Sequence, residues 1–206
     1  MIAIVDYGMG NVRSVLNAFE AIGADAHVTA DPAALDEATH IVLPGVGAFG
    51  DAMAALHQRN LVVPLRRQAL TRHKPFLGIC LGMQLLAKRS TEHGVTDGLG
   101  WFDAEVVRFD LAQPGLNVPH MGWNDIEPAR SHPLFAGLRP SEFTFYFVHS
   151  YRMICDVSDD VAAACDYGGR FVAAIARDNI FAAQFHPEKS QDSGLHILRN
   201  FVEWQT

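Results

Sequence analysis

The chain of 206 residues has the length and composition of one folded domain. Hydrophobic residues make up 49% and charged residues 19%, which excludes the disordered and coiled-coil classes. Lys and Arg number 16 against 23 Asp and Glu, a formal charge of -7, so no basic excess attracts nucleic acid or anionic lipid. Because no signal peptide or apolar run of ~20 residues is evident, we expect a cytoplasmic protein with no membrane partner.

The cysteines form an odd set, Cys80, Cys155 and Cys165, without a CxxC pair. This excludes a disulfide framework and a structural zinc site. The histidines show no metal-ligand spacing such as HExxH, so we expect no metal. The set leaves room for one reactive thiol.

The first half of the chain alternates predicted strands and helices. Short apolar runs, each closed by a turn, predict buried parallel strands at residues 2–6, 40–43 and 75–80. Helical spacing and capping signals predict the intervening helices at residues 12–19, 33–38, 49–60, 64–72 and 81–89. This βαβ alternation is typical of a parallel sheet.

The second half is rich in β-forming residues and closes with an amphipathic helix at 193–204. We expect β-structure at residues 143–153, 161–167, 171–176 and 180–185. The fold class is therefore α/β: an open, mostly parallel sheet flanked by helices, with an antiparallel extension. Residues 1–206 are expected to form a single domain.

Cys80 lies where a predicted strand turns into a predicted helix, with Gly78 and Gly82 two residues to either side. In the serine version of this elbow, the glycines allow close packing and the turn exposes the nucleophile. The start of the helix favours an ionised thiolate, and the Leu81 N–H can point at a developing oxyanion. A buried, inert cysteine between packing glycines is the alternative. The motif favours the nucleophile.

His186 and Glu188, separated by Pro187, are the best candidates for a base and its orienting carboxylate. Proline biases His186 toward extended backbone, in which residues i and i+2 face the same way. A surface turn is the alternative. His149 is a rival base, but it has no carboxylate two residues later. We assign its segment, Phe147-Val-His-Ser-Tyr151, to the pocket wall.

The loop at residues 43–50 carries Gly45, Gly47 and Gly50 at the end of a predicted strand. Its backbone N–H groups can approach a ligand closely, and we interpret it as a second oxyanion donor. A dinucleotide loop fits poorly, because the third glycine is misplaced and no partner acid follows. A plain β-to-α turn stays open.

The segment 119–124 clusters large side chains, among them Trp123, beside Gly122. It reads as core or as a docking surface, and the residues alone favour core. Cys155 and Cys165 lack elbow glycines and are expected to be structural.

Three motifs in this order resemble the class I, triad-type glutamine amidotransferases: Pro44-Gly-Val-Gly47, Gly78-Ile-Cys-Leu-Gly-Met-Gln84 and His186-Pro-Glu188. Further segments narrow the resemblance to the glutaminase subunits of imidazole glycerol phosphate synthase, in histidine biosynthesis: Asp6-Tyr-Gly-Met-Gly-Asn11, Pro119-His-Met-Gly-Trp-Asn124 and His186-Pro-Glu-Lys-Ser190. The resemblance extends over nearly the whole chain.

The resemblance implies that Cys80, His186 and Glu188 form a triad that hydrolyses L-glutamine to glutamate and ammonia. Its oxyanion donors would be Leu81, Val46 and Gly47. The residues that would hold the rest of the substrate are Gly45, Gln84, Glu92, His149, Ser150 and Tyr151. No cofactor is implied.

The resemblance also implies a heterodimer with a cyclase subunit, which uses the ammonia to make imidazole glycerol phosphate and aminoimidazole carboxamide ribotide. The chain length agrees with a separate cyclase subunit, because 206 residues leave no room for a second domain that would use the ammonia. Asn11, Trp123 and Lys189 are the expected contacts with this subunit.

Two other functions stay open. A cysteine hydrolase or peptidase with a similar elbow usually has histidine immediately after the nucleophile, where this chain has Leu81. A non-catalytic binding subunit is the second. Release of glutamate from glutamine distinguishes the three.

Overall fold

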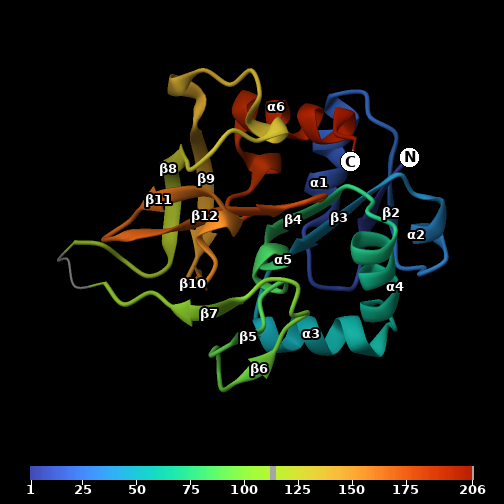
Figure 1. Ribbon diagram of the computed structural model, residues 1–206, viewed down its shortest axis with the longest axis horizontal. Helices are drawn as coiled ribbons and strands as arrows, with labels where there is room; N and C mark the ends of the chain where they lie inside the picture. Colours follow the sequence, from blue (N-terminus) through green and yellow to red (C-terminus); the bar gives the residue numbers. More distant parts are fainter. Residues whose placement is uncertain (112–114, 206) are drawn as a thin grey trace.

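The computed structural model describes residues 1–111 and 115–205 (Figure 1). Within these residues a nine-stranded sheet has the order β2-β1-β3-β4-β13-β12-β11-β8-β9. In that order the strands are β2 (Ala26–Thr29), β1 (Ile2–Val5), β3 (His40–Gly45), β4 (Phe76–Cys80), β13 (Ile180–Ala183), β12 (Arg170–Arg177), β11 (Val161–Asp166), β8 (His120–Pro128) and β9 (Thr144–His149). The pairing is parallel from β2 to β13 and antiparallel from there to β9. The expected α/β sheet with an antiparallel extension is confirmed.

A second sheet lies beside the first, with the order β10-β7-β5-β6. Its strands are β10 (Tyr151–Cys155), β7 (Ala104–Arg108), β5 (Arg89–Ser90) and β6 (Thr96–Asp97). The sequence predicted one β-rich run over 143–153. In the structure this run divides at Ser150, so that β9 joins the first sheet and β10 the second.

Helices cover both faces of the nine-stranded sheet (Figure 1). They are α1 (Val12–Ala21), α2 (Ala34–Glu37), α3 (Phe49–Gln58), α4 (Val62–Arg66), α5 (Leu81–Gln84) and α6 (Gln191–Glu203). Short helical turns are η1 (Arg67–Thr71), η2 (Pro133–Phe135), η3 (Pro140–Glu142), η4 (Ser158–Asp160) and η5 (Pro187–Lys189). Among the described residues, none of these helices has the length and apolar character needed to cross a membrane.

The period-2 alternation of the strands divides the core between the two faces. In β1, Ile2 and Ile4 pack with residues of α1 and α6, whereas Ala3 and Val5 pack with residues of α3. All four residues of β1 are buried. A strand covered on both faces is apolar throughout, which is why the sequence signal for β1, β3 and β4 was a continuous run.

The helix predicted over 81–89 ends at Gln84, and its length was therefore wrong. The backbone carbonyls of Leu85, Leu86 and Ala87 accept hydrogen bonds from N–H groups of residues 99–102. A Cβ on Gly98 would fall 2.2 Å from the Ala87 carbonyl oxygen. Residues 99–102, which follow β6, therefore provide the hydrogen bonds that a further helical turn would have made.

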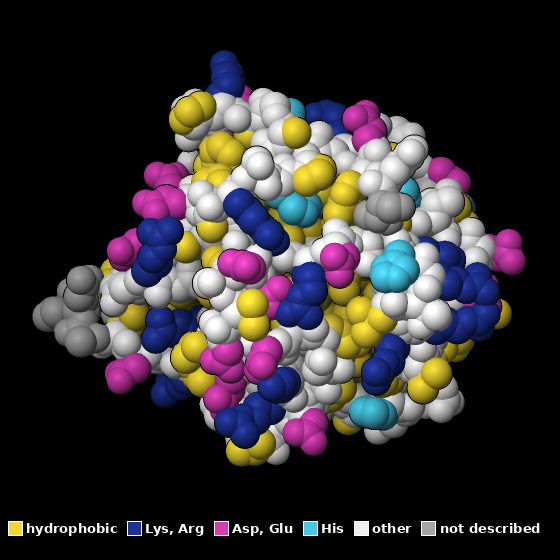
Figure 2. Space-filling view, in the orientation of Figure 1, with side chains coloured by type: hydrophobic (Ala, Val, Ile, Leu, Met, Phe, Trp, Pro, Cys, Tyr) yellow, Lys and Arg dark blue, Asp and Glu magenta, His cyan; other side chains and the backbone are white. Residues whose placement is uncertain are grey.

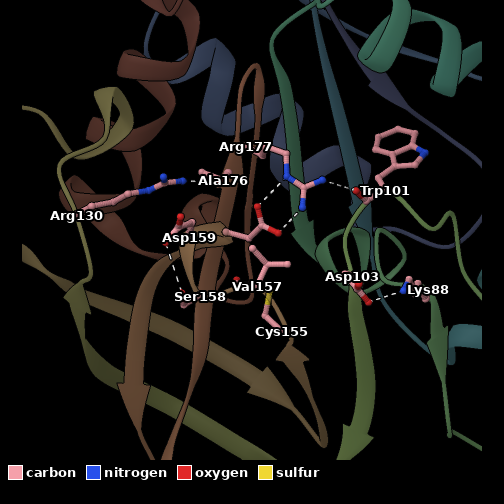
Figure 3. A network of polar contacts seen from close by, with 11 residues as sticks. Lys88, Trp101, Asp103, Arg130, Cys155, Val157, Ser158, Asp159, Ala176 and Arg177 are labelled. Carbon is pink, nitrogen blue, oxygen red and sulfur yellow. Dashed lines mark hydrogen bonds and ion pairs between the residues drawn. The ribbon is translucent and has the colours of Figure 1, made fainter.

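Arg177 at the end of β12 connects the two sheets (Figure 3). Its guanidinium pairs with the buried Asp160, Nε lying 2.8 Å from Oδ1, and donates to the Trp101 carbonyl at 3.0 Å. It also lies over the Phe102 ring, 4.6 Å from the centroid. The loop that leads into β7 is thus held against β12 by one side chain.

Candidate active site

The turn from β4 into α5 places Cys80 at a strained elbow. Cys80 has φ 54° and ψ −110°, a conformation that non-glycine residues rarely adopt and that is typical of functional sites. A Cβ on Gly78 would fall 2.8 Å from the Ala182 Cβ, and one on Gly82 would fall 1.8 Å from the Leu43 carbonyl oxygen. Both flanking glycines are therefore required by close packing, as the motif predicted.

Cys80 opens onto a cavity of about 400 Å³. The cavity is lined by Val46, Gly47, Cys80, Leu81, Gln84, Glu92, Pro119, Val148, His149, Ser150, Tyr151 and His186. Except for Gly45, every residue assigned to the oxyanion or the substrate lies on this wall. Val148 also lies on the wall, as expected for its segment, whereas Pro119 was not anticipated there. Cys155 and Cys165 do not line this cavity, and burial raises the pKa of both thiols, that of Cys165 to about 12.

His186 lines the same cavity as Cys80 and contacts Glu188. His186 Nδ1 lies 2.8 Å from Glu188 Oε1, and both side chains are 2% exposed. His186 has extended backbone, but Glu188 lies in the 3₁₀ turn η5, so the contact does not arise from the extended i, i+2 geometry that we expected. The backbone of His186 is held by Ser190, whose hydroxyl donates to the His186 carbonyl at 2.6 Å.

Burial alone would lower the pKa of His186, yet its surroundings raise it to about 10. The opposing causes are the charge of Cys80 and the Glu188 carboxylate, which is hydrogen-bonded to Nδ1. In the resting geometry Nε2 has no hydrogen-bond partner within the described residues, so we take the charge of Cys80 as the dominant influence. The surroundings of His186 therefore favour its protonated form.

His149, the rival base, has both ring nitrogens occupied. Nδ1 lies 2.8 Å from the Tyr151 carbonyl oxygen and Nε2 lies 3.0 Å from His120 Nδ1. Because the carbonyl can only accept, Nδ1 carries the proton and Nε2 accepts from His120. Burial, opposed by the bond to Tyr151, lowers the pKa of His149 to about 3. His149 is therefore a neutral residue of the cavity wall.

Val46 and Glu92 make contacts that sequence reasoning did not anticipate. The Val46 N–H donates to the Met9 carbonyl at 3.0 Å, so in this geometry it does not point into the cavity. Glu92 lines the cavity, and its carboxylate also accepts from the Phe49 N–H, at 2.7 Å, at the start of α3. Glu92 therefore stabilises the N-terminus of that helix.

Of the residues expected at a partner interface, Asn11 and Lys189 lie beside Glu188. Asn11 caps α1, accepting from the Ser14 N–H at 3.3 Å, and lines a small cavity together with Glu188. Lys189 follows Glu188 in η5. Trp123 lies on β8 and is 47% exposed, so the core position that the residues alone favoured is wrong.

Two buried polar side chains near Cys80 were missed. Gln184 is 0% exposed and its Nε2 lies 3.6 Å from the Cys80 sulfur. Tyr7 has a buried hydroxyl without a partner among the described residues, and burial together with the charge of Cys80 raises its pKa. Neither residue is near Cys80 in sequence, so no local spacing could have indicated the contact.

The family model for glutamine amidotransferase class-I matches residues 3–204. The chain belongs to the class I glutamine amidotransferase family. The amidotransferase is 52% identical over 205 residues to "Imidazole glycerol phosphate synthase subunit HisH" of Syntrophotalea carbinolica, covering 98% of each chain. It is 49% identical over 207 residues to "Imidazole glycerol phosphate synthase subunit HisH 2" of Nitrobacter winogradskyi, again covering 98% of each.

Solved structures agree with this amidotransferase in fold. The structure of PurLQS from Thermotoga maritima superposes with a TM-score of 0.76 at 19% identity, covering 98% of this chain and 97% of that one. A "Crystal structure of glutamine amidotransferase" gives a TM-score of 0.71 at 20% identity, covering 98% of both chains.

Proposed function

We propose that this amidotransferase hydrolyses L-glutamine to glutamate and ammonia at Cys80, and supplies the ammonia to a cyclase subunit. The observation that carries the proposal is the meeting of the Cys80 elbow with the His186–Glu188 pair at one cavity. An activated cysteine with an oriented histidine is the arrangement that nucleophilic acyl transfer requires. Two relatives named as subunits of imidazole glycerol phosphate synthase support the choice of reaction.

In the first half of the reaction the Cys80 thiolate attacks the side-chain carboxamide carbon of glutamine. A carbon–sulfur bond forms, and the carbonyl oxygen takes the negative charge. His186, protonated beside the thiolate, gives its proton to the departing nitrogen, so that ammonia leaves and a glutamyl thioester remains.

In the second half water hydrolyses the thioester. Neutral His186 takes a proton from water, the hydroxide adds to the thioester carbon, and the thiolate of Cys80 leaves with glutamate as the product. Glu188 fixes the ring of His186 and stabilises the imidazolium in both halves.

The Leu81 N–H follows Cys80 directly in the elbow and is the first donor to the oxyanion. The Val46 N–H is bound to the Met9 carbonyl in this geometry, so its contribution requires that bond to break. We propose that Gly47, with φ 95°, supplies the conformational freedom for such a change in the loop.

The amino-acid portion of glutamine is assigned to the wall formed by Gln84, Glu92 and residues 149–151, with Gly45 beneath the loop. Gln84 Nε2 is engaged by the Tyr151 carbonyl and by Gln184, so its amide oxygen is the atom left to accept from the substrate ammonium group.

No group of three or more His, Cys, Asp or Glu that could hold a metal occurs in the described part of the chain.

The proposed partner is the cyclase subunit, whose products are imidazole glycerol phosphate and aminoimidazole carboxamide ribotide. Its docking surface consists of Asn11, Trp123 and Lys189, beside the triad. Trp123 and Met121 are exposed on the same face of β8. Figure 2 shows acidic and basic side chains interspersed over one face of the molecule. An exposed aromatic residue beside an active site is typical of an interface.

The test is Cys80→Ala in the complex with the cyclase subunit. Synthesis that depends on glutamine should be abolished, and synthesis from added ammonium salt should be retained. Loss of both activities in an intact complex would contradict the assignment of Cys80. Cleavage of peptides without release of glutamate from glutamine would instead indicate a peptidase.

A further inference from the structure

A fully buried amide reaches the nucleophile from the opposite half of the chain. Gln184 follows β13, the strand that pairs with β4, and its backbone N–H donates to the Ala173 carbonyl at 2.8 Å. Its side-chain Nε2 lies 3.6 Å from the Cys80 sulfur, within the longer range of hydrogen bonds to sulfur. Its Oε1 lies 2.9 Å from Gln84 Nε2.

The direction of these hydrogen bonds is fixed by the Tyr151 carbonyl, which can only accept. Gln84 Nε2 lies 3.2 Å from this oxygen, so the end of Gln84 that faces it is the NH₂ group. The same NH₂ group requires an acceptor on Gln184, which is Oε1. The NH₂ group of Gln184 is therefore the end that faces the sulfur, and it donates.

We propose that Gln184 is a positioning residue for the nucleophile: its amide, oriented by Gln84, donates a hydrogen bond that favours the Cys80 thiolate and fixes the sulfur at the cavity. This rests on the proposed role of Cys80.

The two ionisation states of Cys80 use this donor differently. A thiol can donate to the Val148 carbonyl, which lies 3.9 Å from the sulfur, and accepts only weakly from an amide. The thiolate has no proton to donate to Val148, and it accepts a charge-assisted hydrogen bond from Gln184. The buried amide therefore stabilises the charged form more than the neutral one.

Several titratable groups surround the sulfur and are left in place when Gln184 is changed. They are His186 with Glu188 behind it, Tyr7 beneath the elbow, and Glu92, His149 and Tyr151 on the cavity wall. Gln184 and Gln84 do not titrate. A change in the ionisation of Cys80 in a Gln184 variant thus reports on the hydrogen bond.

The experiment measures the rate at which iodoacetamide alkylates Cys80 in the isolated chain as a function of pH. Mass spectrometry of the peptide that contains Cys80 separates it from Cys155 and Cys165. Gln184→Met fills nearly the same volume without a donor. We expect the midpoint of the profile to rise by about one pH unit, the effect of one hydrogen bond to a charged group.

Gln68→Met is the matched control. Gln68 is also buried, at 1% exposed, and donates to Asp36 at 2.5 Å, but it does not line the cavity around Cys80. We expect this variant to lose stability and to keep the wild-type alkylation profile. Coincident profiles for wild type and Gln184→Met, or equal shifts in the two Met variants, would overturn the proposal.

A second variant covers the case in which Gln184→Met does not fold. Gln184→Asn keeps a buried amide but is one methylene shorter, so it withdraws the donor from the sulfur, and the midpoint should again rise. An unchanged midpoint in folded Gln184→Asn would overturn the proposal. In Gln84→Met the amide of Gln184 loses its orienting partner, and we expect the midpoint to rise by less than in Gln184→Met. The double variant should have the same midpoint as Gln184→Met alone.

Turnover gives an independent readout. At pH values below the new midpoint, the kcat/KM of Gln184→Met for glutamine should be about tenfold lower than that of the wild type. It should recover at higher pH, whereas a loss of folded protein would lower it at every pH. The alkylation assay needs no turnover, so it stands whether or not Cys80→Ala abolishes the glutaminase reaction. Failure of the Gln184 inference is thereby distinguished from failure of the proposed function.

Discussion

The indole ring of Trp123 meets the ring of Tyr146 edge-on, with centroids 6.1 Å apart and planes at 72°. The two residues are directly opposite each other in the pairing of β8 with β9. The Lys189 ammonium lies 5.8 Å from the centroid of the same Tyr146 ring. An exposed tryptophan is thereby connected to the turn that carries Glu188.

Trp123→Ala tests whether this aromatic contact belongs to a docking surface. We expect the affinity for the cyclase subunit to fall more than tenfold, because truncation of an aromatic residue at an interface centre often costs about 2 kcal/mol. Since Trp123 is 47% exposed, the melting temperature of the isolated chain should change little. Ile154→Ala, at a residue that is 46% exposed on β10, is the control and should bind normally. A large drop in melting temperature with normal affinity would contradict the interpretation.

His186→Ala and Glu188→Gln should differ in severity. Loss of the base is expected to lower kcat by at least ~10²-fold, whereas Glu188→Gln keeps an acceptor for Nδ1 and should cost less. Because Glu188 helps to raise the pKa of His186, the amide variant should also lower that pKa, which NMR titration of the imidazole can measure. Wild-type turnover in His186→Ala would remove His186 from the mechanism.

Arg177→Met should destabilise the fold by about 2 kcal/mol, because it leaves the buried carboxylate of Asp160 without its partner. Urea unfolding provides the measurement. Arg170→Met is the control: its ion pair with Glu127 is exposed on both sides, and we expect a change of at most about 0.5 kcal/mol. If both variants lose the same stability, burial of Asp160 is not the reason.

Stability should decrease as the pH falls from about 6.5 toward 4. Burial lowers the pKa of His120 and His132 to about 4 and that of His149 to about 3, whereas an unfolded histidine titrates near 6.5. In this window the unfolded chain binds more protons than the folded one, so the free energy of unfolding falls with pH. The raised pKa of His186 acts oppositely: its contribution is present below about 6.5 and is lost as the pH rises toward 10.

His132→Asn isolates one part of this pH dependence. His132 caps η2 by accepting from the Leu134 N–H, and asparagine can provide the same cap without titrating. The slope of unfolding free energy between pH 5 and 6.5 should lose the contribution of up to about one proton. An unchanged slope would show that the pKa of His132 is the same in the folded and unfolded states, which contradicts the prediction.

Much of the site was predictable because it is encoded locally. Gly78, Cys80 and Gly82 specify the elbow within five residues, and the close approaches of both glycines explain why nothing larger fits. His186 and Glu188 are two residues apart, so their contact depends on one turn, even though that turn is 3₁₀ rather than extended. The predicted substrate residues at 149–151 lie where β9 ends and β10 begins, within a run whose β-pattern was evident.

The sequence by itself determined β1, β3, β4 and β13 of the parallel half, the elbow at Cys80 and the contact of His186 with Glu188, since each depends on neighbouring residues. It did not indicate β2, whose residues are half-buried or exposed and form no continuous apolar run. Only the tertiary structure decided which distant segments share one environment. The pairing of β13 with β4 brings Gln184 to Cys80 across 104 positions, and the pairing of β8 with β9 leaves Trp123 exposed while burying His120. Such contacts depend on sheet order and register, which long-range packing sets and which no local spacing encodes.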